Sequence, residues 1–228
     1  MAKERNAGKK GKQGNGITEG VIWKQLLIFF FPILFGTFFQ QLYNTVDAVI
    51  VGRFVGKEAL AAVGGSTGTL INLLVGFFVG LSSGATVIIS QFYGGGREKR
   101  VSEAVHTAIA FSLACGVGLM VIGIAASPIA LRAMGTPDDI MQYSLSYMRI
   151  YFLGIIPNLV YNMGAGILRA IGDSKRPLYY LMASCFTNIV LDLVLVVWLR
   201  LDVRGAAIAT IVSQLVSAVL VVLQLLRT

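Results

Sequence analysis

The feature that most constrains the fold is a long apolar stretch near the start of the chain, residues 26–51, LLIFFFPILFGTFFQQLYNTVDAVIV. It is long enough to cross a bilayer, because about 20 apolar residues span the hydrocarbon core. It also contains Pro32 and the carboxylate of Asp47, and a carboxylate at bilayer depth costs about 2.5–3.5 kcal/mol on insertion scales. Gln40, Asn44 and Asp47 lie at i, i+4 and i+7 and share one helix face. We expect this face to point at protein or at a water-filled cavity rather than at lipid.

The whole chain has the composition of an all-α integral membrane protein. Of its 228 residues, 56% are hydrophobic and only 13% are charged, whereas soluble domains are about 25% charged. The apolar runs far exceed the roughly 10-residue strands of an outer-membrane barrel. The net charge of +8 does not indicate a nucleic-acid partner, because the basic residues lie between the apolar runs. One histidine, two cysteines inside apolar runs and the lack of a catalytic constellation predict neither a metal motif nor an enzyme.

Six membrane spans are predicted after a basic tail. Residues 1–16 have almost no apolar content and are predicted to be a disordered cytoplasmic tail. Residues 17–228 are predicted to form a six-helix transmembrane lobe. The first apolar run is too long for a signal peptide, whose apolar core has roughly 7–15 residues. The spans are expected at about residues 26–51, 60–92, 101–134, 143–171, 178–199 and 206–226.

The orientation in the membrane is predicted from lysine and arginine residues in the short loops, which favour the cytoplasm. Thirteen of these residues lie on the side of the N-terminal tail and six lie on the other side. We therefore expect a multi-pass protein of the cytoplasmic (inner) membrane with both termini in the cytoplasm.

Two carboxylates are predicted to lie at a similar depth in the outer half of the membrane. With a rise of 1.5 Å per residue, Asp47 and Thr210 lie roughly 6–8 Å, and Asp192 roughly 9–10 Å, from the outer ends of their spans. Asn188 lies one turn before Asp192. Two carboxylates, an amide and a hydroxyl at one level are suited to hold a proton or, with oxygen ligands, a sodium ion. Mid-membrane carboxylates are a usual form of proton relay in transporters.

The fourth predicted span also carries a polar face. Tyr147, Tyr151, Asn158 and Asn162 fall near one side of the helix, and Pro157 is expected to kink it. Polar side chains in membrane helices often do no more than bond one helix to another, for about 0.6 kcal/mol on average. This structural alternative stands for each serine, threonine or asparagine taken alone. It is weaker for the two aspartates, because no mid-membrane arginine is available to neutralise them.

The second predicted span has a glycine face. Gly76, Gly80 and Gly84 lie at four-residue spacing. Small residues at this spacing let two helix backbones approach closely in a membrane. We interpret these glycines as a helix-packing face, with a hinge as the alternative.

Taken together, these residues resemble those of the multidrug and toxic compound extrusion (MATE) transporters, most closely the bacterial and archaeal branch with the NorM and DinF groups. The resemblance covers nearly all of residues 17–227. It rests on Pro32, Gln40 and the pair Val46-Asp47, on GGGREKR at 94–100, on LRAIGD at 168–173 with Pro177, and on Asn188 with Asp192. Each match is weak alone, and their common order and spacing make the set specific.

The resemblance implies a twelve-helix transporter of two six-helix lobes related by a pseudo-two-fold axis. It implies antiport, in which organic and often cationic drugs and toxic compounds are exported in exchange for protons or sodium ions, without a cofactor. Carried over by position, the cation site is Asp47, Asn188, Asp192 and Thr210, which is a metal site only if sodium is the coupled ion. The expected substrate cavity contains Gln40, Asn44, Tyr147, Asn158 and Asn162. Pro32 matches the kink proline of the first helix, a proposed hinge.

This chain would supply only the N-terminal lobe. The expected partners are the lipid bilayer, small organic or amphiphilic substrates, and a second six-helix lobe. We expect a fragment of a longer chain rather than a half that assembles with another half-chain. One rival is a flippase of the same superfamily for lipid-linked precursors, which would need cavity arginines to meet pyrophosphate. No arginine lies deep in any predicted span, which favours a cationic or neutral substrate. The other rival is an inactive half-length fragment or membrane scaffold.

Overall fold

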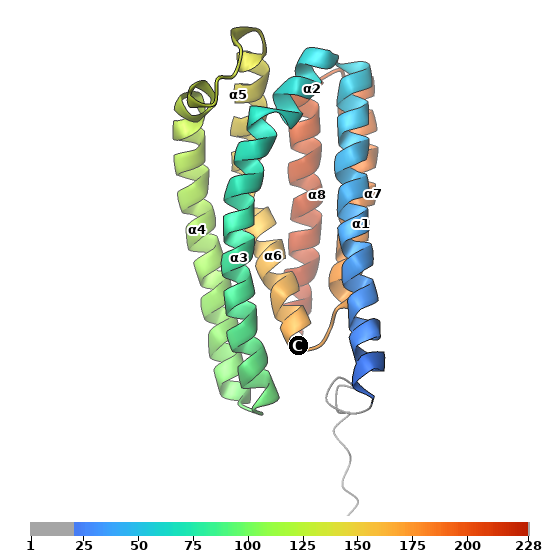
Figure 1. Ribbon diagram of the computed structural model, residues 1–228, viewed down its shortest axis with the longest axis vertical. Coiled ribbons are helices and arrows are strands. Elements are labelled where there is room, and N and C mark those ends of the chain that lie inside the picture. The colour runs from blue at the N-terminus through green and yellow to red at the C-terminus, as the bar shows by residue number, and fades with distance from the viewer. Residues whose placement is uncertain (1–20, 228) are drawn as a thin grey trace, which may run out of the picture.

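The computed structural model describes residues 21–227, except for the side chains of Ile22 and Gln25. Its long helices run side by side along one axis (Figure 1). The predicted tail, residues 1–16, lies outside the described residues. The elements are α1 (Ile22–Phe54), α2 (Lys57–Gly64), α3 (Ser66–Gly94), α4 (Glu98–Ala133), α5 (Asp138–Leu153), α6 (Ile155–Ala170), α7 (Lys175–Asp192), the π-helix η1 (Leu193–Trp198) and α8 (Asp202–Leu225).

Six membrane spans are present in this part of the chain, as predicted. Five are long and apolar enough on their own, and the bent pair α5–α6 makes the sixth. The start of α1, the α3–α4 and α6–α7 connections and the end of α8 lie at one end of the bundle, here called the terminal end (Figure 1). The α1–α2, α4–α5 and η1–α8 connections lie at the opposite end.

Two spans are broken where the sequence predicted a continuous helix. The second span is divided into α2 and α3 at Gly65, where an added Cβ would lie 2.5 Å from the Ala61 carbonyl oxygen. The fifth span ends as a π-helix directly after Asp192. Short π-helical segments are rare and are frequently found at functional sites.

The bend of the fourth span lies three residues before the proline expected to cause it. α5 and α6 meet at Gly154 at an angle of 51°. A Cβ at Gly154 would lie 2.2 Å from Cγ1 of Ile211 on α8. Pro157 has no N–H to donate to the carbonyl oxygen of Leu153 four residues earlier, and its ring clashes with that carbonyl, so it interrupts the helix at this point. The bend thus lies where the sequence predicted a kink, and the absence of a side chain at Gly154 lets α8 pack closely against it.

α8 occupies the centre of the lobe, where it contacts α1, α2, α5, α6, α7 and η1. Its small residues permit this packing, since Gly205, Ala206, Ala207 and Ala209 are all buried. Large apolar side chains elsewhere face outward, as at Phe77, Ile122 and Ile129. This arrangement fits a bundle whose surroundings are lipid.

The glycine face of α3 does not pack against another helix within the described residues. No atom lies within 4 Å of a Cβ added at Gly76, Gly80 or Gly84. The packing interpretation is therefore wrong within this lobe, because the face is open at its surface.

Candidate cation site and cavity

A pair of carboxyl groups lies between α1 and α7. Asp47 is 7% exposed, and Asp192, the last residue of α7, is fully buried. Their side chains lie next to each other. The two groups can meet because α1 and α7 run side by side in the bundle. The structure thus brings together the two carboxylates that the sequence predicted at one level.

Several polar atoms of this cluster have no hydrogen-bond partner among the described residues. They are Oδ1 of Asp47, both carboxyl oxygens of Asp192, and both amide atoms of Asn188. Buried side-chain polar atoms are nearly always hydrogen-bonded in proteins, so such a concentration calls for an explanation. Oxygen-rich clusters of this kind suit a proton, a water molecule or a hard cation.

Thr210 lies beside the cluster on α8. Its hydroxyl donates to the Ala206 carbonyl oxygen at 2.9 Å and retains acceptor capacity. Tyr43, one turn before Asp47 on α1, lies next to Thr210 and close to both carboxyl groups. We did not select Tyr43 from the sequence, although its four-residue spacing from Asp47 was a signal that could have identified it.

Tyr147 lies in the core beside the cluster. It is buried, close to Asp47 and Asp192, and stacked on Tyr151 with ring centroids 6.2 Å apart. Tyr151 in turn lies next to Gln214 of α8. These two rings wall the cluster on the α5 side.

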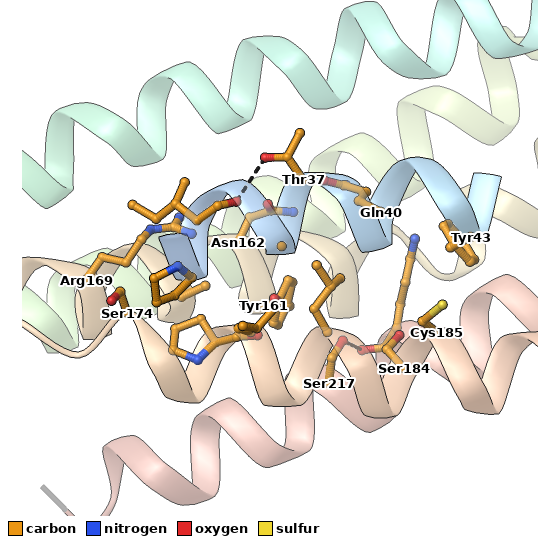
Figure 2. A pocket seen from close by; sticks show the side chains of 18 of the residues that line it. Thr37, Gln40, Tyr43, Tyr161, Asn162, Arg169, Ser174, Ser184, Cys185 and Ser217 are labelled. Carbon is orange, nitrogen blue, oxygen red and sulfur yellow. Dashed lines mark hydrogen bonds between the residues drawn. The ribbon is translucent and has the colours of Figure 1, made fainter. Parts of the chain in front are cut away.

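A cavity of about 140 Å³ lies between α1, α6, α7 and α8 on the terminal side of the carboxyl pair (Figure 2). Tyr43 lines it and also lies close to the two carboxyl groups. The polar lining is made of Thr37, Gln40, Tyr43, Asn158, Tyr161, Asn162, Arg169, Ser174, Ser184, Gln214 and Ser217. Pro32 also lines the cavity. The Nδ2 of Asn162 donates to two oxygens of Asn158, the carbonyl oxygen at 2.9 Å and Oδ1 at 3.1 Å.

The cavity residues expected from the sequence divide into two groups. Gln40, Asn158 and Asn162 line the cavity. Tyr147 lies at the carboxyl cluster instead, and Asn44 lies on the exposed side of α1, where its Nδ2 donates to Gln41 Oε1 at 3.3 Å. Gln40 and Asn44 do share a face of α1 and are both exposed, but the cavity reaches Gln40 and not Asn44, one turn further along the helix.

The position of Arg169 differs from the prediction that no arginine reaches the interior of the lobe. Its position at the end of a span suggested that no arginine would reach the interior. The half-buried side chain lines the cavity, which Figure 2 shows beside Ser174. Gln214 of α8 is a further lining residue, and it was not predicted from the sequence.

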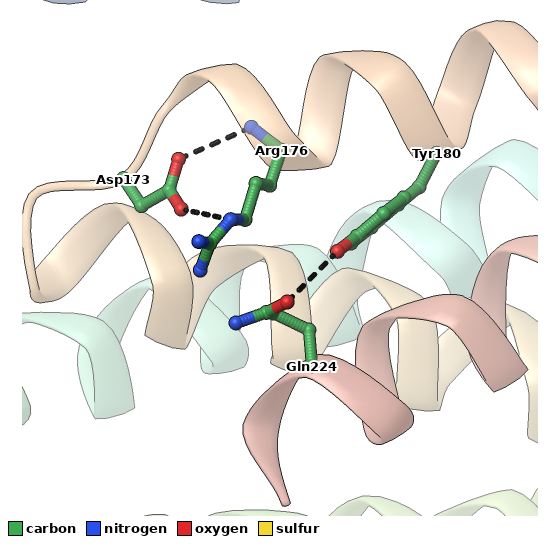
Figure 3. Close-up of polar contacts among 4 residues, drawn as sticks. All are labelled: Asp173, Arg176, Tyr180 and Gln224. Atoms are coloured by element: carbon green, nitrogen blue, oxygen red, sulfur yellow. Dashed lines mark hydrogen bonds and ion pairs between the residues drawn. The ribbon is translucent and has the colours of Figure 1, made fainter. Parts of the chain in front are cut away.

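Polar contacts fix the start of α7 at the terminal end of the cavity (Figure 3). The Arg176 backbone N–H donates to Asp173 Oδ1 at 3.1 Å, and Arg176 Nε pairs with Asp173 Oδ2 at 3.2 Å. The Tyr180 hydroxyl lies 3.5 Å from Gln224 Oε1 on α8. The Tyr161 hydroxyl donates to the Pro177 carbonyl oxygen at 3.0 Å, which joins α6 to α7.

Comparison with known proteins agrees with this architecture. A protein of Bacillus subtilis (strain 168) named "Probable multidrug resistance protein YoeA" is 36% identical over 84% of this chain and 42% of its own length. Solved structures of MATE in its straight and bent conformations match with TM-scores of 0.86 and 0.84 and 27% identity. The match to the straight conformation covers 95% of this chain and 48% of the matched chain. The match to the bent conformation covers 93% of this chain and 47% of the matched chain.

The chain thus spans less than half the length of these relatives, the share that one six-helix lobe of a twelve-helix transporter would occupy. The family model described as MatE matches residues 32–194, which include Pro32, Asp47, Asn188 and Asp192. That range covers most of the lobe, from the lower half of α1 to the end of α7. The chain belongs to the MATE family of multidrug and toxic compound extrusion proteins.

Proposed function

We propose that this chain is the N-terminal lobe of an exporter of drugs and toxic compounds that is coupled to protons or sodium ions. The observation that supports coupling is the adjacent pair Asp47 and Asp192 with its unsatisfied oxygens. Two buried carboxylates side by side repel each other unless a cation lies between them. The proposed cation site is Asp47, Asn188, Asp192 and Thr210.

The coupling mechanism follows from the place of Tyr43. A cation entering the carboxyl pair neutralises it and draws α1 and α7 together. Tyr43 contacts the cluster and lines the cavity, so a shift of α1 changes the cavity wall as well. Pro32 removes one backbone hydrogen bond within α1 and serves as the hinge. Cation binding shifts the equilibrium between the two conformations of the lobe only by the difference in its affinity for them.

The second lobe completes the transporter beside α1 and α3. α1 exposes Gln41, Asn44 and Thr45 outside the cavity. Exposed amides and hydroxyls in a membrane helix favour contact with protein or water over contact with lipid. The open glycine face of α3 permits close packing of another helix. Both termini of this lobe face the cytoplasm, and the protein lies in the cytoplasmic membrane.

The test is transport by the full-length protein in liposomes, with a fluorescent drug as substrate. A proton gradient and a sodium gradient are imposed separately. We expect one of them to drive export, and expect Asp47→Asn and Asp192→Asn each to abolish the coupled component. Asp138→Asn, which alters an exposed carboxylate, is the matched control and should behave like the wild type. Unchanged gradient-driven export by either site variant would refute the coupling role.

A further inference from the structure

Arg169 is the only charged side chain among the described residues that line the cavity. Asp47 and Asp192 lie outside the lining, beyond Tyr43. The remaining polar lining groups are neutral amides and hydroxyls. The charge presented inside this cavity is therefore positive, opposite to what a site built for an organic cation requires.

No carboxylate in the described part of the chain neutralises Arg169. The nearest acidic residue in sequence, Asp173, is already engaged through both oxygens, by the Arg176 backbone N–H and by Arg176 Nε. The other neighbour of the guanidinium is the neutral Tyr161, whose hydroxyl donates to the Pro177 carbonyl oxygen. Arg169 thus keeps its hydrogen-bond donors available to a molecule in the cavity.

The surroundings of Arg169 favour an anion further. Ser174 is 7% exposed, lines the cavity and makes no capping bond to α7. The N-terminal end of α7 lies at the same place, but the Asp173 carboxylate already accepts from its Arg176 backbone N–H, so Arg169 and Ser174 are the groups available to an anion. Ile33, Leu178 and Leu181 line the cavity as well and offer apolar surface. A charged head and an apolar body are therefore accommodated within one cavity.

We propose that Arg169 binds the carboxylate or phosphate group of an amphiphile whose apolar part lies against Ile33, Leu178 and Leu181. Guanidinium pairs with such groups through two parallel hydrogen bonds. The inference rests on the proposed function in that the cavity is where an exported molecule binds. The alternative is that Arg169 only extends toward the membrane surface, as arginines near span ends often do.

The test compares two probes with the same chain and opposite head groups, octyl phosphate and octyltrimethylammonium. Binding to the full-length protein in phosphatidylcholine nanodiscs is measured by calorimetry. We expect tighter binding of octyl phosphate, and expect Arg169→Gln to weaken it about tenfold or more through loss of charge-assisted hydrogen bonds. Lys175→Gln removes an exposed positive charge at the same end of the bundle and should change the affinity less than about twofold, because exposed charges are screened.

Arg169→Lys distinguishes loss of the charge from a folding defect. It keeps the positive charge and should bind octyl phosphate more tightly than Arg169→Gln. The proposal is overturned if the wild type prefers octyltrimethylammonium, or if Arg169→Gln and Lys175→Gln have the same effect. Nanodiscs containing phosphatidylglycerol identify the source of the anion. If phosphatidylglycerol weakens octyl phosphate binding to the wild type but not to Arg169→Gln, the site binds a lipid headgroup. If phosphatidylglycerol leaves binding to the wild type unchanged, the site binds soluble amphiphiles.

This binding assay uses no ion gradient, so its outcome is separate from that of the transport assay. Arg169-dependent phosphate binding without gradient-driven export would refute the coupling proposal alone. Gradient-driven export without that binding would refute the anion site alone.

Discussion

The carboxyl group of Asp47 near the end of α1 lies next to that of Asp192 at the end of α7. Oδ1 of Asp47 and both oxygens of Asp192 lack hydrogen-bond partners among the described residues. Held this close in a buried place, the pair is relieved only by a proton or a cation. The predictions below follow from this pair and from the packing around it.

Cation binding should stabilise the folded protein through the carboxyl pair. A ligand at one hundred times its dissociation constant adds about 2.7 kcal/mol to the free energy of unfolding. We expect the melting temperature of the full-length protein to rise with sodium, relative to choline at equal ionic strength, or else with falling pH. The rise should vanish in Asp47→Asn. Equal melting curves under all of these conditions would contradict the cation site.

Tyr43 should contribute to coupling through its hydroxyl group. The hydroxyl lies next to Thr210 and close to both carboxyl groups, so Tyr43→Phe should weaken cation binding by about 0.5–1.5 kcal/mol, the net value of one hydrogen bond. The measurement is the cation concentration at half-maximal export. Tyr179→Phe changes an exposed ring and should leave that concentration unaltered. A Tyr43→Phe variant indistinguishable from this control would assign Tyr43 to packing alone.

Pro32→Ala should stiffen α1. Alanine supplies a backbone N–H, which restores one intrahelical hydrogen bond. We expect a higher melting temperature and slower export, because a straight α1 resists the bend that the mechanism requires. The matched change is Pro128→Ala in α4, which lies outside the cavity lining and should raise the melting temperature without slowing export. Equal export rates in the two variants would rule out the hinge.

Gly154→Ala should destabilise the lobe by overpacking. The added Cβ would lie 2.2 Å from Ile211 Cγ1, and overpacking typically costs about 1–3 kcal/mol. Ile211→Ala should relieve the clash, so Gly154→Ala should cost less in that background when unfolding is followed by heat or denaturant. Gly118→Ala has no atom within 4 Å and should be neutral or stabilising by up to about 1 kcal/mol. Additive effects of Gly154→Ala and Ile211→Ala would show that the two residues do not touch.

The sequence by itself determined the all-α membrane class and the six spans, and it placed two carboxylates at one level. An apolar run of about 20 residues or more identifies a membrane span, because it matches the thickness of the hydrocarbon core. The helical rise per residue then converts a position in the span into a depth. Asp47, Asp192 and Thr210 were therefore expected at one level before their helices were known to be neighbours. Tyr43 could have been included on the same ground, because it lies one turn from Asp47.

Only the tertiary structure decided which helices meet and how each is rotated. Periodicity places Gln40 and Asn44 on one face of α1, so it could not show that the cavity reaches Gln40 but not Asn44. It also could not show that the Arg169 side chain lines the cavity rather than only reaching toward the membrane surface. The close approach of Ile211 on α8 to Gly154 is a contact between distant segments that no local pattern records. Packing between helices supplied this information, because it fixes the rotation of each helix and the direction of each long side chain.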